Sequence, residues 1–318
     1  MYEVLSTSRV LESRVLYTVW CIGQVREGKK SGVMAARRRL REVARCCSTV
    51  ARAPVAAVVA PGNCVFGEEW VAAPLLARKA VAHDSISLTF GLADRAASLG
   101  LSTCACLLAK GGVGSDGEPV VRPYTPTSTN AQLGSFELIV KVYPDGVLSQ
   151  AMAALSIGSN DIKFKHVAPN VKVQYPFGAK HVAMLVGGTG ITPMLQALHA
   201  ILGTEDDTTT VSLLCGNKTE EDILLRATLD GWAAQFPARL RVTHVLSDAP
   251  HSSEWRGANG FIDADAIRAH VPPPADSPLI FVCGPPPMYA ALCGARDDAA
   301  LTGTLAELGY AAERVVKF

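Results

Sequence analysis

The stretch Val182-Ala-Met-Leu-Val-Gly-Gly-Thr-Gly-Ile-Thr-Pro-Met194 decides how the second half of this chain folds. The unbroken apolar run Val182–Val186 is typical of a strand that is covered on both faces of a parallel sheet. The glycines after it allow a tight turn, and we expect a helix capped by Thr192, with Pro193 in its first position and Gly203 at its end. The pattern predicts a strand–turn–helix unit whose helix N-terminus can bind phosphate.

Alternating strand and helix patterns continue from this unit to the end of the sequence. We expect, in order, a strand Val211–Cys215, a capping-box helix start at Thr219–Asp222, a strand Arg241–Leu246, a helix Asp263–His270, a strand Leu279–Cys283 and a helix after Pro286. This alternation predicts an α/β domain with a doubly wound parallel sheet. Cys283-Gly-Pro-Pro-Pro-Met288 ends the last strand, at the sheet edge where such domains bind ligands.

The preceding part of the chain has the period of β-strands. Ser85–Phe90 and Phe136–Tyr143 alternate apolar and polar residues, which places Phe136, Leu138, Val140 and Val142 on one face of a strand. Clusters of Gly, Ser, Asp and Pro separate such segments, and one short helix is expected near Ser149–Leu155. We therefore predict an N-terminal antiparallel β-barrel over residues 68–178, an α/β domain over residues 179–318, and a basic extension over residues 1–67.

A second motif, Arg122-Pro-Tyr-Thr-Pro-Thr-Ser128, lies in the predicted barrel. Neighbouring prolines fix the backbone around Arg122, whose guanidinium can bind a phosphate through two hydrogen bonds. Tyr124 offers a flat face to a ligand ring, and Thr125 offers a hydroxyl that can form a hydrogen bond. The alternative is a surface arginine on a Pro-rich edge strand. Gly146–Ser149 opens the short helix, and its free N–H groups could bind an anion; the alternative is a plain helix start capped by Ser149.

Composition excludes several classes of protein. The chain has 318 residues, 49% of them hydrophobic, and a net charge of +1, which suits two ordinary globular domains. Residues 1–66 hold 11 Lys and Arg and 4 Asp and Glu, so residues 67–318 hold the remaining 19 basic and 25 acidic residues. Because residues 67–318 are acidic overall, we do not expect them to bind a nucleic acid. The nine cysteines form no CxxC pair, and we expect reduced thiols and no metal.

The basic extension resembles a targeting segment. From Met34 onward it is rich in Arg, contains Ala and Ser, and has one acid, Glu42, before Pro61, which favours a mitochondrial transit peptide; a disordered basic tail is the alternative. Met34 as the natural start is a further hypothesis. Ala53–Pro61 is too short to span a bilayer, which takes roughly 20 apolar residues, but it could dip into a membrane surface. Peripheral association with the cytosolic face of a membrane is therefore the second expectation for location.

Taken in order, the three motifs resemble the NADH–cytochrome b5 reductase family, within the ferredoxin–NADP reductase-like superfamily. The resemblance covers roughly residues 70–318 and includes Phe136–Tyr143, Asn217–Arg226 and Glu313–Phe318. It implies an FAD-binding barrel followed by a nicotinamide-binding α/β domain. It also implies that a hydride passes from NADH to FAD and that single electrons then reach a haem protein, cytochrome b5 first among them.

The same resemblance implies the roles of single residues. Arg122 would bind the FAD pyrophosphate, Pro123 would shape the turn, and Tyr124 and Thr125 would line the flavin, with Thr125 near its N5. Thr125 and Cys283 would position flavin and nicotinamide for hydride transfer. The other residues expected on the flavin side are Ile139, Lys141, Val147, Leu148, Ser149, Thr189 and Thr192. Those expected in the nicotinamide cleft are Gly188, Gly190, Pro193, Cys283, Gly284, Pro285, Pro287 and Met288.

Two departures from the family pattern bear on the cofactors. Val147-Leu148-Ser149 stands where the family has Lys-Met-Ser, so one cation near FAD is missing. In Leu246-Ser-Asp-Ala-Pro250 the acid that favours NADH comes one place late, so NADH is expected and NADPH is the alternative. We expect a monomeric enzyme. Its rivals are an NAD(P)H reductase of a ferric chelate, a quinone or a ferredoxin, and a reductase-like scaffold without activity.

Overall fold

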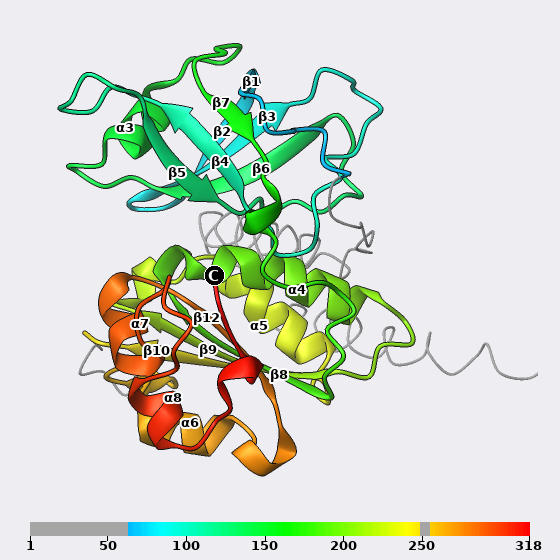
Figure 1. The fold of residues 1–318 in the computed structure, drawn as a ribbon, viewed down its shortest axis with the longest axis vertical. Coiled ribbons are helices and arrows are strands. Elements are labelled where there is room, and N and C mark those ends of the chain that lie inside the picture. The colour runs from blue at the N-terminus through cyan, green and yellow to red at the C-terminus, as the bar shows by residue number, and fades with distance from the viewer. Residues whose placement is uncertain (1–62, 249–254) are drawn as a thin grey trace, which may run out of the picture. The chain divides into compact units, whose positions relative to one another are not determined.

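The computed structural model describes residues 63–248 and 255–318, and these belong to one compact unit, Ala51–Phe318 (Figure 1). The expectations for residues 1–62, which concern targeting, the Met34 start and the apolar run Ala53–Pro61, lie outside the described residues. Two antiparallel sheets come first along the chain and a parallel sheet comes second. The predicted fold class is thereby confirmed, whereas the domain limits at residues 67 and 178 stay predictions.

The first part of the chain folds into two antiparallel sheets and one helix. One sheet has the order β1-β7-β4-β5, formed by Val71–Ala72, Lys163–Lys165, Leu107–Gly111 and Val120–Tyr124. The other has the order β2-β3-β6, formed by Leu75–Ala82, Ser85–Gly91 and Ser135–Lys141. Helix α3, Val147–Ala154, packs near β4 and β5. Because β6 ends at Lys141, Val142 lies beyond the strand face on which the sequence placed it.

Aromatic rings fill the core between these two sheets. Phe90, Phe136 and Phe164 have no exposed surface, and their ring centroids lie 4.9–5.6 Å apart. Phe136 shares its face of β6 with Leu138 and Val140, as the alternation predicts. Ile139, on the other face of β6, is buried in a different cluster together with residues of the second domain. The strand therefore contacts both cores.

The second part is a parallel sheet with helices on both faces (Figure 1). Its order is β11-β10-β9-β8-β12-β13, formed by Ala258–Asn259, Leu240–Leu246, Thr210–Asn217, His181–Gly187, Leu279–Cys283 and Val315–Lys317. The helices are α4 Ile191–Gly203, α5 Arg226–Gln235, α6 Ala264–His270, α7 Pro286–Leu292 and α8 Gly303–Glu307. Val182, Met184 and Val186 of β8 face one core cluster, and Ala183 and Leu185 face the other. The unbroken apolar run is thus buried on both sides, as predicted.

Strand order places the ligand-binding edge of this sheet. The chain goes from β8 outward to β9 and β10, and then returns to β12 on the other side of β8. The direction of winding reverses between β8 and β12, so the turns after these two strands border the crevice in which doubly wound domains bind ligands. Those turns are Gly187–Gly190 and Cys283–Pro286, which are two of the motifs singled out in the sequence.

The predicted cap at Thr192 is wrong for a local geometric reason, and the alternative cap at Ser149 is wrong too. A 3-10 turn, Gly188–Gly190, runs directly into α4, so helical geometry begins at Ile191 and Thr192 lies inside the helix. The Thr192 hydroxyl instead donates to the carbonyl of Thr189 at 3.1 Å. Helix α3 begins at Val147, so Ser149 is not its cap either; the cap residue is Gly146. In contrast, Asp263 caps α6 through Ala266, and Thr219 and Asp222 form the predicted capping box.

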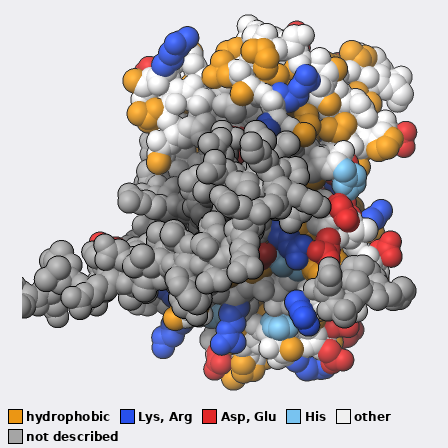
Figure 2. Space-filling model, turned by 180° about the vertical axis from the view of Figure 1, so that it is seen from behind, with side chains coloured by type: hydrophobic (Ala, Val, Ile, Leu, Met, Phe, Trp, Pro, Cys, Tyr) orange, Lys and Arg blue, Asp and Glu red, His pale blue; other side chains and the backbone are white. Residues whose placement is uncertain are grey.

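The described surface differs between the two parts. Figure 2 shows many apolar side chains over the antiparallel sheets on the face that it displays. Among the described residues, the strongly exposed large apolar side chains lie before residue 178, apart from Phe261, which is 78% exposed. Within the described ranges, no helix combines the length and apolarity that crossing a membrane requires.

Candidate functional site

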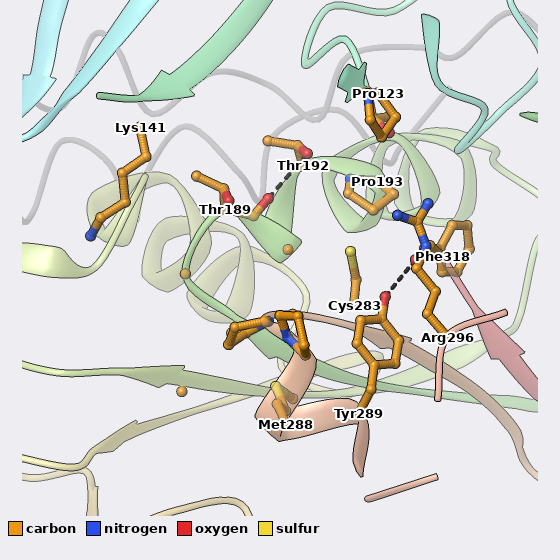
Figure 3. A pocket seen from close by; sticks show the side chains of 18 of the residues that line it. Pro123, Lys141, Thr189, Thr192, Pro193, Cys283, Met288, Tyr289, Arg296 and Phe318 are labelled. Carbon is orange, nitrogen blue, oxygen red and sulfur yellow. Dashed lines mark hydrogen bonds between the residues drawn. The ribbon is translucent and has the colours of Figure 1, made fainter. Parts of the chain in front are cut away.

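One cavity of about 1240 Å³ is lined by both parts of the fold (Figure 3). Strands β4, β5 and β6 contribute one wall, and the turns after β8, β9, β10 and β12 contribute the other. A single drug-sized ligand takes roughly 300–1,000 Å³, so this cavity can hold more than one such group. Its position at the reversal of strand order is where the sequence motifs placed a ligand.

Most of the predicted site residues line this cavity. From the first part of the chain these are Pro123, Tyr124, Thr125, Ile139 and Lys141. From the second part they are Gly188, Thr189, Gly190, Thr192, Pro193, Cys283, Gly284, Pro285, Pro287 and Met288. Four others are not among the lining residues, namely Arg122, Val147, Leu148 and Ser149. The structure therefore brings together the predicted flavin and nicotinamide residues and leaves the predicted phosphate residues beside them.

The two glycine-containing turns meet backbone to backbone. A Cβ atom on Gly190 would lie 2.0 Å from the carbonyl oxygen of Cys283, so a side chain there would force the turns apart. A Cβ on Gly187 would lie 2.9 Å from the Met288 sulfur. Gly188 has a φ of +53° and nothing within 4 Å of its Cβ position, so its backbone is open to an approaching ligand. The glycines thus allow close packing at Gly187 and Gly190 and leave the backbone accessible at Gly188 between them.

Gln196 of α4 joins the Arg122–Ser128 motif to the second domain. Its Nε2 donates to the carbonyls of Pro126 at 2.8 Å and Ser128 at 3.2 Å, and its Oε1 accepts from the N–H of Cys104 at 2.9 Å. The side chain is 6% exposed. Since buried backbone groups need partners, this amide fixes the wall that carries Tyr124 and Thr125 against helix α4. Burial also raises the pKa of Tyr124 to about 12, so its phenol stays neutral.

Lys141 forms a second connection between the two parts. Its ammonium lies 2.6 Å from a carboxylate oxygen of Asp84 and 3.3 Å from one of Asp222. Burial alone would lower the pKa of Lys141, but the hydrogen bonds with both acids raise it overall. Burial likewise opposes ionisation of Asp222, yet bonds from Thr219 and Lys141 lower its pKa. His83 lies 3.6 and 3.8 Å from the same two acids, and the lysine supplies the cation between them.

Cys283 presents a neutral thiol at the edge of the cavity. Burial raises the pKa of this thiol to about 11, although Tyr289 and Arg296 oppose the rise. A thiol with this pKa is a poor nucleophile near neutral pH. The residue can shape and position a ligand, and it is unsuited to attack one.

The predicted phosphate region uses its side chains for internal bonds. The Ser149 hydroxyl donates to the Gly146 carbonyl at 3.0 Å and accepts from the Tyr143 N–H at 3.2 Å. Leu148 is 2% exposed and packs in the core of the first domain. What this loop can offer an anion is therefore the backbone N–H groups of the first turn of α3. Arg122 is exposed, and one outer nitrogen of its guanidinium, Nη1, donates to the Val121 carbonyl at 2.7 Å.

Several residues that line the cavity lie outside the three sequence motifs. Asp222 was identified only as part of a capping box, and Phe261 had no pattern around it. Tyr289 is the residue after the last motif, and Arg296 follows that motif by several residues. The sequence held one indication of Gln196, because it is the single amide in the mostly apolar stretch Ile191–Leu202. An isolated polar residue on a buried helix face indicates a polar partner elsewhere in the fold.

Comparisons with known proteins agree with this geometry. The description "Oxidoreductase FAD-binding domain" matches residues 72–182, and "Oxidoreductase NAD-binding domain" matches residues 184–294. The NADH-cytochrome b5 reductase 2 of Aspergillus clavatus is 38% identical over 261 residues, which cover 79% of each chain. That of Yarrowia lipolytica is 39% identical over 79% of this chain and 86% of its own.

A solved structure agrees as well. The cytochrome b5 reductase domain of Ulva prolifera nitrate reductase superposes with a TM-score of 0.67 and 29% identity, over 80% of this chain and 97% of that domain. The two cofactor domains and the cavity between them make the protein an enzyme rather than a scaffold. This chain belongs to the NADH–cytochrome b5 reductase family and is an oxidoreductase that uses FAD and NADH.

Proposed function

We propose that this enzyme reduces cytochrome b5 or a similar small haem protein. The observation that carries the proposal is the single cavity into which Tyr124, Gly188 and Cys283, one from each motif, are brought together. Relatives of similar length carry the name NADH-cytochrome b5 reductase 2. When bound, NADH and FAD would supply the redox chemistry, which is hydride transfer from nicotinamide to flavin followed by transfer of single electrons to a haem.

The residues present fit an FAD at this site. The open backbone at Gly188, the neutral ring of Tyr124 and the hydroxyl of Thr125 give a cradle for a planar ring system on the cavity wall. Arg122 and the first-turn N–H groups of α3 would hold the pyrophosphate, since Arg122 is an exposed cation and the start of a helix offers N–H groups to an anion. Their place beside the cavity suits the far end of a long dinucleotide.

The protein's own part in the reaction is to orient the two rings. Thr125 and Cys283 would hold flavin and nicotinamide in register, and the neutral state of the Cys283 thiol excludes a covalent role near neutral pH. Lys141, Asp222, Ser247 and Phe261 line the cavity where the NADH ribose and adenine would extend. The related enzymes are named as NADH reductases, and Asp248, which follows the lining residue Ser247, would supply the carboxylate that disfavours a 2′-phosphate.

Two cations at the cavity are suited to an acidic haem protein. Lys172 and Arg296 come from opposite parts of the fold, are both exposed, and line the same cavity. Charges of this kind steer a partner of opposite sign toward the site and make its association sensitive to salt. A partner that presents carboxylates around an exposed haem edge fits this pair.

The test compares charge-reversal variants with a matched control. Lys172→Glu combined with Arg296→Glu should raise KM for cytochrome b5 and flatten its dependence on ionic strength. Lys79→Glu, an exposed lysine on β2 outside the cavity, should leave both unchanged. If purified enzyme with NADH reduces ferric chelates, quinones or a ferredoxin with much higher kcat/KM than cytochrome b5, the acceptor proposal is wrong.

We also propose a mitochondrial location, a monomeric state and contact with a membrane surface. The Arg-rich segment after Met34 supports targeting, and the exposed apolar side chains of the first domain support surface contact. Residues 1–66 fused to a fluorescent protein should enter mitochondria. A cytosolic signal from that fusion would contradict mitochondrial targeting. Light scattering of the purified protein tests the monomeric state, and a mass above that of one chain would contradict it. Co-sedimentation of the full chain with lipid vesicles tests the membrane contact, and a protein that stays in the supernatant would contradict it.

A further inference from the structure

Tyr289 is a buried tyrosine whose hydroxyl meets the end of the sequence beside the nicotinamide motif. It follows Cys283–Met288 on helix α7 and is 4% exposed. Its hydroxyl donates to the backbone oxygen of Phe318 at 2.5 Å, and the Val282 carbonyl lies 3.4 Å away (Figure 3). A phenol has one proton to donate, so the bond to Phe318 uses it.

Tyr289 also acts on Cys283, which lines the same cavity. The phenol restrains the rise that burial causes in the pKa of the thiol. Burial, with the neighbouring thiol, keeps the pKa of Tyr289 well above its usual range, so both groups are neutral at physiological pH. The phenol donates to Phe318 while the thiol is neutral, and a thiolate at Cys283 would compete for the same proton, which explains why Tyr289 opposes the rise in the pKa of the thiol.

Phe318 is held at the cavity by more than this bond. Its N–H donates to the Val282 carbonyl at 3.1 Å, and β13 pairs with β12 in parallel register. Its ring packs against Phe281 at 5.2 Å between centroids and lines the cavity. Tyr289 therefore connects three parts of one wall: the end of β12, the thiol of Cys283 and the ring of Phe318.

We propose that Tyr289 is a positioning residue for hydride transfer, which fixes the Cys283 thiol and Phe318 in the wall against which the nicotinamide is placed. The inference rests on the proposed use of this cleft by NADH. Tyr289 does not touch the reacting atoms in this account and gives up no proton. Its effect is to restrict the rotation of the Cys283 thiol and of Phe318. If these groups were mobile, a smaller fraction of bound nicotinamide would be correctly oriented for hydride transfer.

The test uses Tyr289→Phe, which removes one oxygen and keeps the ring. The matched control is Tyr310→Phe: Tyr310 is also buried, at 7% exposed, and its hydroxyl also donates to a backbone carbonyl, that of Pro272 at 2.9 Å. Tyr310 is absent from the cavity lining. Each variant loses the hydrogen bond of a buried tyrosine to a backbone oxygen, buried for Tyr289 and part-buried for Tyr310, so a purely structural role predicts losses of similar size in both.

Two measurements separate positioning from stability. In stopped-flow reduction of the bound flavin by NADH, Tyr289→Phe should slow the rate about tenfold, whereas Tyr310→Phe should stay within about twofold of wild type. In peptide-resolved alkylation of Cys283 by iodoacetamide without NADH, Tyr289→Phe should move the pH profile upward, because the thiolate loses a hydrogen-bond donor. Tyr310→Phe should leave that profile in place.

The outcomes are distinct. A Tyr289→Phe enzyme with wild-type flavin reduction and an unchanged alkylation profile overturns the inference, and so do equal rate losses in both variants. If the wild-type flavin is not reduced by NADH at all, the proposed function fails, while the alkylation profile still reports on the coupling of Tyr289 and Cys283. A shifted profile together with a selective rate loss supports the positioning role.

Discussion

Replacing Gln196 with Leu tests whether the two cofactor domains depend on one buried amide. The change keeps the size of the side chain and removes its three hydrogen bonds. The Cys104 N–H and the Pro126 carbonyl then stay buried without their partner, and each such group costs about 1–3 kcal/mol. The Ser128 carbonyl is only part-buried and can bind water. We therefore expect a loss of about 2–6 kcal/mol in the free energy of unfolding.

Urea unfolding followed by tryptophan and flavin fluorescence measures this loss as a shift of the midpoint. The control is Gln150→Leu on helix α3, whose Nε2 makes one exposed bond to the Tyr143 carbonyl. Because water can replace that bond, the control should lie within about 0.5 kcal/mol of wild type. If Gln196→Leu is as stable as Gln150→Leu, the amide does not hold the two domains together and the reasoning is refuted.

Three further changes address the site. Gly190→Ala would place a Cβ 2.0 Å from the Cys283 carbonyl oxygen, so we expect the free energy of unfolding to fall by about 1–3 kcal/mol, measured by urea unfolding. Flavin reduction, measured by stopped flow, should also be slower. The control is Gly67→Ala, where the added Cβ meets open space, and it should change neither quantity. The lowered pKa of Asp222 means that its stabilisation is complete above its ordinary value of 3.8 and is lost as pH falls below it. In Asp222→Asn, Tm should therefore fall less between pH 5 and pH 3 than it does in the wild type. An equal fall of Tm in both proteins would show that the ion pair between Lys141 and Asp222 does not stabilise the fold. Ser247→Asp puts a carboxylate on the cavity wall and should raise the ratio of kcat/KM for NADH over NADPH about tenfold; an unchanged ratio would place the ribose elsewhere.

Local patterns carried much of this fold because they record local physics. An unbroken apolar run such as Val182–Val186 has few stable environments other than the middle of a parallel sheet. Glycines at 187, 188 and 190 mark a turn in which side chains would collide or block access. The order of the motifs then determines which turns meet at the reversal between β8 and β12. The cavity and most of its lining could therefore be predicted.

What escaped prediction depends on residues far apart in the sequence. Gln196 bonds to residues about 70 positions earlier, and Lys141 pairs with Asp222, 81 positions later. No period or spacing encodes such pairs, since they form only when two domains pack. Thr192 was misassigned for a local reason. Threonine is a residue type common at helix caps, but the 3-10 turn before it starts the helical geometry several residues earlier.

The most direct test of the account is anaerobic titration of the purified protein with NADH, followed by ferric cytochrome b5. The single cavity, lined by the Arg122–Ser128, Gly187–Met194 and Cys283–Met288 motifs, predicts that the protein carries FAD and that NADH bleaches its flavin absorption. Added cytochrome b5 should then restore the flavin spectrum while its own haem is reduced, two haems for each flavin. A protein that holds no FAD, or a bound flavin that NADH leaves oxidised, would contradict the account.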